Sequence, residues 1–145
     1  MGTTYDKDIV AWSAEQAALL RAGRLSELDI EHIAEEIEDV GKSEQRELAS
    51  RMVVLLAHLL KWVHQPGLRS ASWQVTIKTQ RTAIARRLSK TPSLRPLLAD
   101  PEEIDDWWGD ARVAASHETG LDILTFPEAC PWTMAQAIEE TFWPD

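Results

Sequence analysis

The stretch from Ser43 to Gln65 constrains the fold of this chain more than any other. It contains no Gly or Pro, and its apolar side chains recur at spacings of three and four. They form two adjacent stripes, which are Leu48, Met52, Leu55, Leu59 and Trp62, and Ala49, Val53, Leu56, Leu60 and Val63. Because two stripes make a wide apolar face, the spacing predicts a helix that other helices largely surround. Leu59 and Trp62 are expected in the core.

The other segments also predict helices, and none predicts a strand. Asp100-Pro101 followed by two glutamates combines an N-cap residue, a first-turn Pro and first-turn acids, so a helix should begin there. Thr133 and Gln136 fit a capping box at the start of a short helix. We therefore predict an all-α single domain over residues 1–145, an irregular bundle of about six helices around the Ser43–Gln65 helix.

A narrower apolar stripe precedes the central helix. It consists of Ile30, Ile33, Ile37 and Val40, and five acidic residues occupy the other faces of the same segment. We expect a cationic group in the fold to compensate these acids. Gly41 then either breaks the chain or only kinks it, and Ser43, a good N-cap residue, favours a break.

The composition suggests a soluble protein of a reducing compartment. A single cysteine, Cys130, excludes an intrachain disulfide. No targeting segment is visible at the N-terminus, where Asp6 and Asp8 appear at once. No apolar run reaches the length of a membrane span. These features predict a cytoplasmic protein without membrane segments, and no motif calls for a cofactor.

The charged residues are arranged in three blocks. Residues 1–47 hold twelve acids and five bases, residues 48–99 nine bases and no acid, and residues 100–145 twelve acids and one base. Such blocks pair with each other in the fold or face a charged partner. The basic segment 48–99 could therefore bind nucleic acid or another anionic ligand. A net charge of −9 favours internal pairing and disfavours nucleic acid without excluding it. The candidate binding residues of this segment are His58, Lys61, Arg69, Trp73 and Arg81.

Arg81 has the most specific expected contact. It stands beside the apolar stripe of its predicted helix, so packing should bury part of its side chain. Its own segment contains no acid, and Glu35 and Glu36 lie beside another apolar stripe. Because the planar guanidinium can bind a carboxylate through two hydrogen bonds, we predict that Arg81 pairs with Glu35 or Glu36.

A metal site is an alternative use of the same acidic helix. His32 and Glu36 share a helix face, and His58 lies on the central helix. Helical bundles build metal sites from Glu and His on facing helices. The usual Glu-x-x-His pair is absent, however, and Asp29 of Asp-x-x-His is better used as a helix cap. A solvated or ion-paired acidic face is the stronger interpretation.

Several motifs along the chain resemble one bacterial family. They are Tyr5-Asp6 with Trp12, the run from Glu15 to Arg21, Ala34 to Glu38, Leu55 to Trp62, Gln65-Pro66, Ser72-Trp73, Pro92 to Pro96, Phe126-Pro127, Cys130-Pro131 and Phe142 to Pro144. In combination they are similar to the family catalogued as domain of unknown function 29. The resemblance implies a small all-helical bacterial protein and transfers no catalytic role.

No recognisable nucleophile, phosphate-binding loop or metal motif points to catalysis. We therefore expect a non-enzymatic interaction or structural module. A homodimer and a different protein partner both remain open at this point.

Overall fold

The computed structural model describes residues 2–145, which contain helices and loops and no strand. The α-helices are α1 (Ile9–Arg21), α2 (Ile30–His64), α3 (Ala71–Lys90), α4 (Pro101–Thr119) and α5 (Met134–Ile138). Short 3-10 helices connect them, namely η1 (Leu25–Glu27), η2 (Pro66–Leu68), η3 (Pro92–Ala99) and η4 (Ile123–Thr125). The predicted all-α fold is confirmed.

Two helices expected to be separate are continuous in α2. This helix has 35 residues and runs through Gly41 and Ser43, so the expected break is wrong. A glycine inside a helix costs only about 1 kcal/mol relative to Ala. The strong helix formers between Glu44 and Leu48 offset that cost. Gly41 also lacks the positive φ typical of a helix end, which among the described residues is found at Gly23 and Gly120.

The predicted starts of the later helices are confirmed. The Asp100 side chain accepts a hydrogen bond from the Glu102 amide, and Pro101 is the first residue of α4. At α5, the Thr133 hydroxyl accepts from the Gln136 amide, and the Gln136 side chain accepts from the Thr133 amide. Both caps satisfy amides that have no partner inside the helix.

The chain divides into two compact units. Unit 1 contains the described residues up to Glu44, and unit 2 comprises residues 45–145. α2 contributes its first part to unit 1 and its second part to unit 2. One domain over residues 1–145 stays a prediction.

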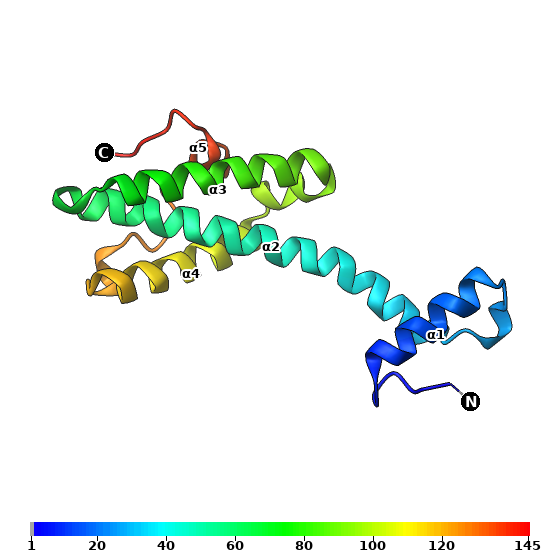
Figure 1. Ribbon diagram of the computed structural model, residues 1–145. Coiled ribbons are helices and arrows are strands. Elements are labelled where there is room, and N and C mark those ends of the chain that lie inside the picture. The colour runs from blue at the N-terminus through cyan, green and yellow to red at the C-terminus, as the bar shows by residue number, and fades with distance from the viewer. Residues whose placement is uncertain (1) are drawn as a thin grey trace. The chain divides into compact units, whose positions relative to one another are not determined.

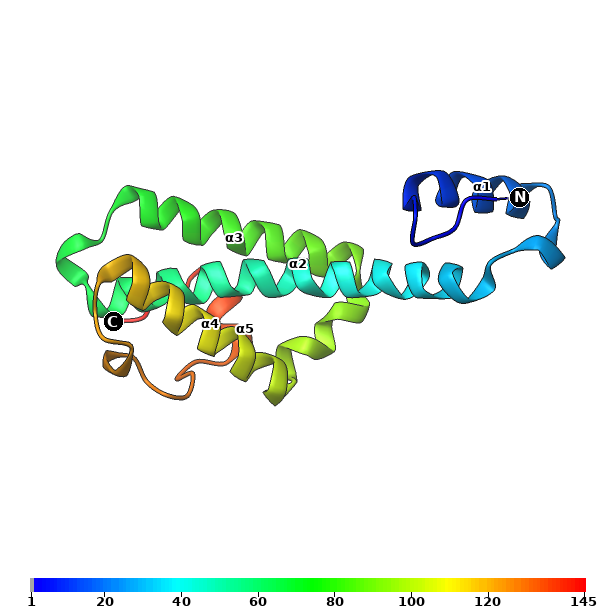
Figure 2. The same cartoon turned by 90° about the horizontal axis from the view of Figure 1, so that it is seen from below.

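Unit 2 contains the hydrophobic core. In both views the second part of α2 lies between α3 and α4 (Figures 1 and 2). Leu59 is 0% and Trp62 is 9% exposed, so both lie in the core, as expected. Leu48, Met52 and Leu55 of the same stripe are also buried. They pack against buried residues of the neighbouring helices, including Ile77, Ile84, Leu88, Trp107, Trp108 and Ala111.

Unit 1 consists of α1, η1 and the first part of α2. Among its described residues, Trp12 is the only buried one. Ile37 and Val40 are each 67% exposed, so most of the first α2 stripe faces solvent. No helix within residues 2–145 combines the length and the apolar character that crossing a bilayer requires.

Candidate functional site

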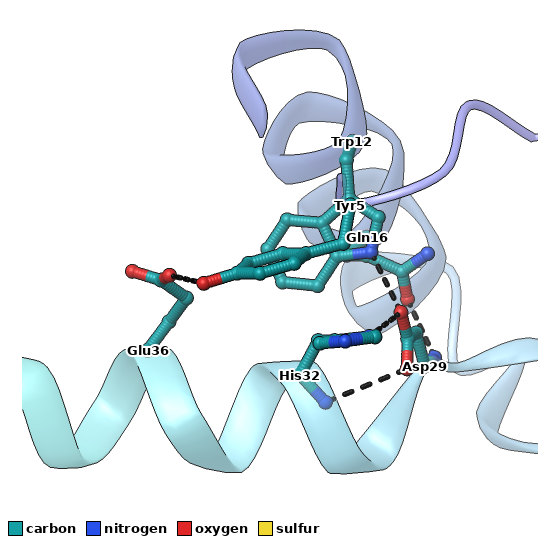
Figure 3. A network of polar contacts seen from close by, with 6 residues as sticks. All are labelled: Tyr5, Trp12, Gln16, Asp29, His32 and Glu36. Carbon is teal, nitrogen blue, oxygen red and sulfur yellow. Dashed lines mark hydrogen bonds and ion pairs between the residues drawn. The ribbon is translucent and has the colours of Figure 1, made fainter. Parts of the chain in front are cut away.

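A polar network around Trp12 and Asp29 holds unit 1 together (Figure 3). Asp29 Oδ1 accepts a hydrogen bond from the His32 amide and so caps the start of α2, as its position before the helix predicted. Its Oδ2 atom accepts from Trp12 Nε1 at 2.9 Å and lies 2.7 Å from His32 Nδ1. The Asp29 amide donates to Gln16 Oε1 at 2.8 Å. One carboxylate therefore connects α1 to α2.

Tyr5 attaches the segment before α1 to this network. Its ring stacks on His32 with centroids 4.2 Å apart, and it meets Trp12 edge-on at 4.9 Å. Its hydroxyl donates a hydrogen bond to Glu36 (Figure 3). This bond raises the pKa of Tyr5 to about 12, with smaller contributions from burial and from neighbouring carboxylates. Tyr5 therefore stays protonated at neutral pH and donates its hydroxyl proton.

The pKa values of Asp29 and His32, the two titratable groups at the centre of the network, shift in opposite directions. The bond to His32 lowers the pKa of Asp29 below its ordinary 3.8, although burial opposes the shift. The same bond raises the pKa of His32 above its ordinary 6.5, again against burial. Each shift favours the charged form, so the pair is an ion pair at weakly acidic pH.

An apolar groove runs beside this network in unit 1. It has a volume of about 250 Å³ and is lined by Trp12, Ser13, Gln16, Ala17 and Leu20 of α1 and by Ile33, Glu36, Ile37 and Val40 of α2. Trp12, Gln16 and Glu36 belong to both the groove and the network. The hydrogen bonds of these three residues therefore also help to hold the α1 and α2 walls of the groove in place. Leu20 lies at the rim of the groove and is 49% exposed.

The first part of α2 also presents acids that the described chain does not neutralise. Glu31, Glu35, Glu38 and Asp39 make no hydrogen bond or ion pair within residues 2–145. The cationic group expected to compensate these acids is found only in part: Glu35 helps to raise the pKa of His32, but none of the four forms an ion pair within residues 2–145. Unit 1 combines an open apolar groove with a strongly acidic surface.

A family model covers both units. The model described as Domain of unknown function DUF29 matches residues 4–143. The chain belongs to this family. The resemblance drawn from the sequence motifs is thus confirmed over nearly the whole chain. No curated protein and no solved structure matches. The family description names no activity, so residue roles in this DUF29 protein rest on geometry.

Arg81 of the DUF29 chain has partners that the sequence did not suggest. It is 2% exposed and donates to the carbonyl oxygens of Ala137 at 2.9 Å and Phe142 at 2.7 Å. A longer contact of 3.5 Å reaches the Glu140 carbonyl. The predicted pair with Glu35 or Glu36 is therefore wrong. The irregular chain after α5 leaves carbonyls without helical partners, and the buried guanidinium satisfies them.

Lys61 and Arg69 are also engaged inside unit 2. Lys61 Nζ lies 2.7 Å from Glu118 Oε2 and 5.3 Å from the ring centroid of Trp73. Arg69 Nε donates to the Trp62 carbonyl at 2.8 Å, and its guanidinium lies 4.7 Å from the centroid of the Trp62 ring. Several basic residues of the segment 48–99 thus make contacts within unit 2.

The metal alternative receives no support from the arrangement of the described residues. Within residues 2–145, no group of three His, Cys, Asp or Glu is placed to hold a metal ion. His32 pairs with Asp29, and Glu36 accepts from Tyr5. His58 Nδ1 lies 2.8 Å from the Val54 carbonyl, and burial lowers its pKa.

Unit 2 has a second hollow, of about 420 Å³, at its C-terminal end. Trp132, Phe142, Trp143 and His64 line it, with three prolines between them. Burial lowers the pKa of His64, so this ring is mainly neutral at neutral pH. The hollow therefore presents mainly apolar and aromatic surface, with the acidic residue Asp145 in its lining.

Sequence reasoning missed the residues that shape the groove. Tyr5 and Trp12 appeared in the family motifs, and Asp29 was expected to cap a helix, but their mutual contacts have no spacing pattern. The available signal was the stripe of Ile33, Ile37 and Val40 on a helix with many acids. It indicated an apolar face, but not that the face would be open.

Proposed function

We propose that this protein is a non-enzymatic interaction module whose α1–α2 groove receives an amphipathic helix of a partner protein. The observation that carries the proposal is the groove itself, with Leu20, Ile37 and Val40 largely exposed around it. Contiguous exposed apolar surface of this kind commonly marks an interaction site. A cytoplasmic location, suggested by the single Cys130, belongs to the same proposal.

The shape of the groove favours a helix as its occupant. Ile33, Ile37 and Val40 repeat at spacings of four and three along one wall, and the opposite wall is the helix α1. A third helix can pack its own apolar residues between two such walls, as in helix-in-groove recognition. Full burial of a side chain such as Ile37 is worth roughly 1.5–3 kcal/mol, so a few anchors supply useful affinity.

The polar network supports a binding role in place of a chemical one. Asp29 uses its carboxylate on Trp12 and His32, and Tyr5 uses its hydroxyl on Glu36. These contacts hold α1 against α2 and so keep the groove formed before a partner arrives. A preformed site loses less conformational entropy on binding.

The test measures, by fluorescence anisotropy, how tightly the protein binds a labelled amphipathic helical peptide that has an aliphatic face. Ile37→Asp should weaken binding by at least about tenfold, because it places a charge in the apolar wall. The matched control is Val113→Asp on α4, since Val113 is 58% exposed and lies in unit 2. Equal affinities of the two variants would refute the groove as the binding site.

A second candidate function is binding of an anionic ligand on the outer face of α3. Lys78 and Arg86 flank a shallow hollow of about 290 Å³ lined also by Thr79, Thr82 and Ala83. Neither cation has a carboxylate partner within residues 2–145. Titration with a short DNA duplex and with inorganic phosphate tests this function. Affinity that falls steeply with salt and is lost in Lys78→Gln/Arg86→Gln would support it, and no binding of either probe would exclude it.

A further inference from the structure

We infer that the helix received by the α1–α2 groove is cationic, with Lys or Arg flanking its apolar face. This inference rests on the proposed function and adds the chemical class of the partner. Apolar surface fixes where the partner sits, and the surrounding charge selects which helix sits there.

The net charge of unit 1 provides the first argument. Residues 2–44 contain eleven acidic and four basic side chains, a net charge of −7. Glu31, Glu35, Glu38 and Asp39 make no hydrogen bond or ion pair within the described chain. Bringing a neutral or acidic helix against this surface would leave these charges unpaired. A cationic helix would pair with them and would also be attracted before contact.

The position of the acids relative to the groove provides the second argument. At 100° per residue, Glu31 and Glu38 lie together on one side of α2, about a third of a turn around the helix from Ile37. Glu36 lines the groove itself. A helix seated on the Ile33, Ile37 and Val40 stripe would therefore have the Glu36 carboxylate beside it, and the acids further round α2 would attract it through the net negative charge of unit 1.

A second copy of this chain fits the groove poorly. Two copies of unit 1 would bring like charges together. The helix with a basic outer face, α3, carries Lys78, Arg86 and Lys90. Among its described residues, however, Val75 is the only exposed large apolar side chain. A single anchor cannot supply the repeated apolar contacts that a groove-binding helix needs. The fitting occupant is a helix of a different protein.

The experiment compares three helical peptides that share one aliphatic face and differ in the polar face, which is rich in Lys, Gln or Glu. We expect the Lys peptide to bind at least about tenfold more tightly than the Gln peptide at low salt, and the advantage to shrink as salt screens the charges. Glu31→Gln/Glu38→Gln should reduce this advantage, because it makes unit 1 less negative by two charges. Asp105→Asn/Asp106→Asn, the same charge change at two exposed positions of α4, should leave it intact.

The outcomes separate the inference from the function beneath it. If all three peptides bind equally and Ile37→Asp abolishes binding, the groove is a helix-docking site and its preference for cations is refuted. If no peptide binds, the proposed function itself fails. If sedimentation velocity finds a dimer that Ile37→Asp dissociates, a second copy occupies the groove and the inference is overturned. Circular dichroism of each variant verifies that it remains helical.

Discussion

Within the one helix α2, residues 30–40 and residues 48–62 both repeat apolar side chains at spacings of three and four. Leu48, Met52 and Leu55 in the second stretch are each 0% exposed, whereas Ile37 and Val40 in the first are each 67% exposed. Two similar apolar stripes on one helix thus differ in exposure: the second is buried, and most of the first faces solvent.

The difference lies in what each unit supplies to cover its stripe. In unit 2, α3, α4 and the aromatic C-terminal segment contribute buried residues to one cluster. In unit 1, the 13 residues of α1 face the stripe, and their one buried member is Trp12. Periodicity therefore determines that a helix has an apolar face, and the neighbouring chain determines whether that face is buried or exposed.

The largest expected effect comes from truncating two side chains of the second stripe, and the same change in the first stripe serves as the comparison. Leu59→Ala should lower the free energy of unfolding by about 2–5 kcal/mol, because it leaves a cavity in a packed core, and Trp62→Ala by about 3–5 kcal/mol. Ile37→Ala should change it by less than about 0.5 kcal/mol, since the side chain is mostly in water. Urea denaturation followed by circular dichroism measures all three.

Either of two results would contradict this comparison of the two stripes. If Leu59→Ala and Trp62→Ala unfold like the parent protein, the second stripe is not the core. If Ile37→Ala is as costly as Leu59→Ala, the first stripe is covered in solution, and the groove is already occupied by this chain or a copy of it.

The next effect concerns how unit 2 secures its C-terminal segment. Arg81→Met should cost about 2–3 kcal/mol, because main-chain carbonyls of Ala137 and Phe142 lose hydrogen bonds from a charged donor. Burial lowers the pKa of Arg81, so removing the charge also relieves some desolvation. Limited proteolysis should show earlier cleavage after α5.

Arg86→Met is the control for this prediction. Arg86 is exposed on the same helix, and the substitution should change stability by less than about 0.5 kcal/mol. If the two variants are equally stable, the C-terminal segment does not depend on the Arg81 guanidinium.

Much of the fold was predictable from the sequence, because it follows from local signals. The stripe from Leu48 to Trp62 marked the core, and the caps at Asp100 and Thr133 marked helix starts. The continuity through Gly41 was missed because the helix formers after it outweigh one glycine. The partners of Arg81 could not be found by matching charges, since they are main-chain carbonyls, which every residue carries.

The candidate site was less predictable than the core. Its residues come from the segment before α1, from α1 and from the start of α2, and their contacts follow no periodic pattern. Trp12 could have bonded to any of the neighbouring carboxylates, and the sequence did not single out Asp29. The sequence indicated the apolar face of α2, the cap at Asp29 and the shared face of His32 and Glu36, but not the α1 and Tyr5 contacts that these residues make.

A smaller effect is expected from Trp12→Phe, which should destabilise unit 1 without destabilising unit 2. Trp12→Phe keeps the aromatic ring but removes the Nε1 hydrogen bond to Asp29, at a cost of about 1 kcal/mol. We expect amide hydrogen exchange in α1 to accelerate while amides of residues 52–60 keep their protection, since unit 1 has few buried contacts. An equal loss of protection in both stretches would mean that the units unfold together.

The smallest expected effect is a dependence of unit 1 on pH through His32 and Asp29. The pKa of His32 is raised above 6.5, chiefly by the bond to Asp29, with Glu35 and Asp6 adding to it. Its contribution to stability is therefore complete below about pH 6.5 and is lost as pH rises through the folded pKa. The pKa of Asp29 is lowered, so its contribution is present above 3.8 and is lost as pH falls through its folded value. Tyr5, with a pKa of about 12, does not titrate in this window.

The measurement is the NMR titration of the histidine ring protons together with exchange protection of α1. Protection should decline as His32 loses its proton, and Asp29→Asn should move the His32 pKa back toward 6.5. His58 and His64 are internal controls, because burial lowers the pKa of each without any contact to Asp29. A His32 that titrates below 6.5 in the parent protein would show that its ring is not paired with Asp29 in solution. The Asp29 carboxylate that anchors Trp12 would then lack its second partner, and the contrast between the two units would be larger still.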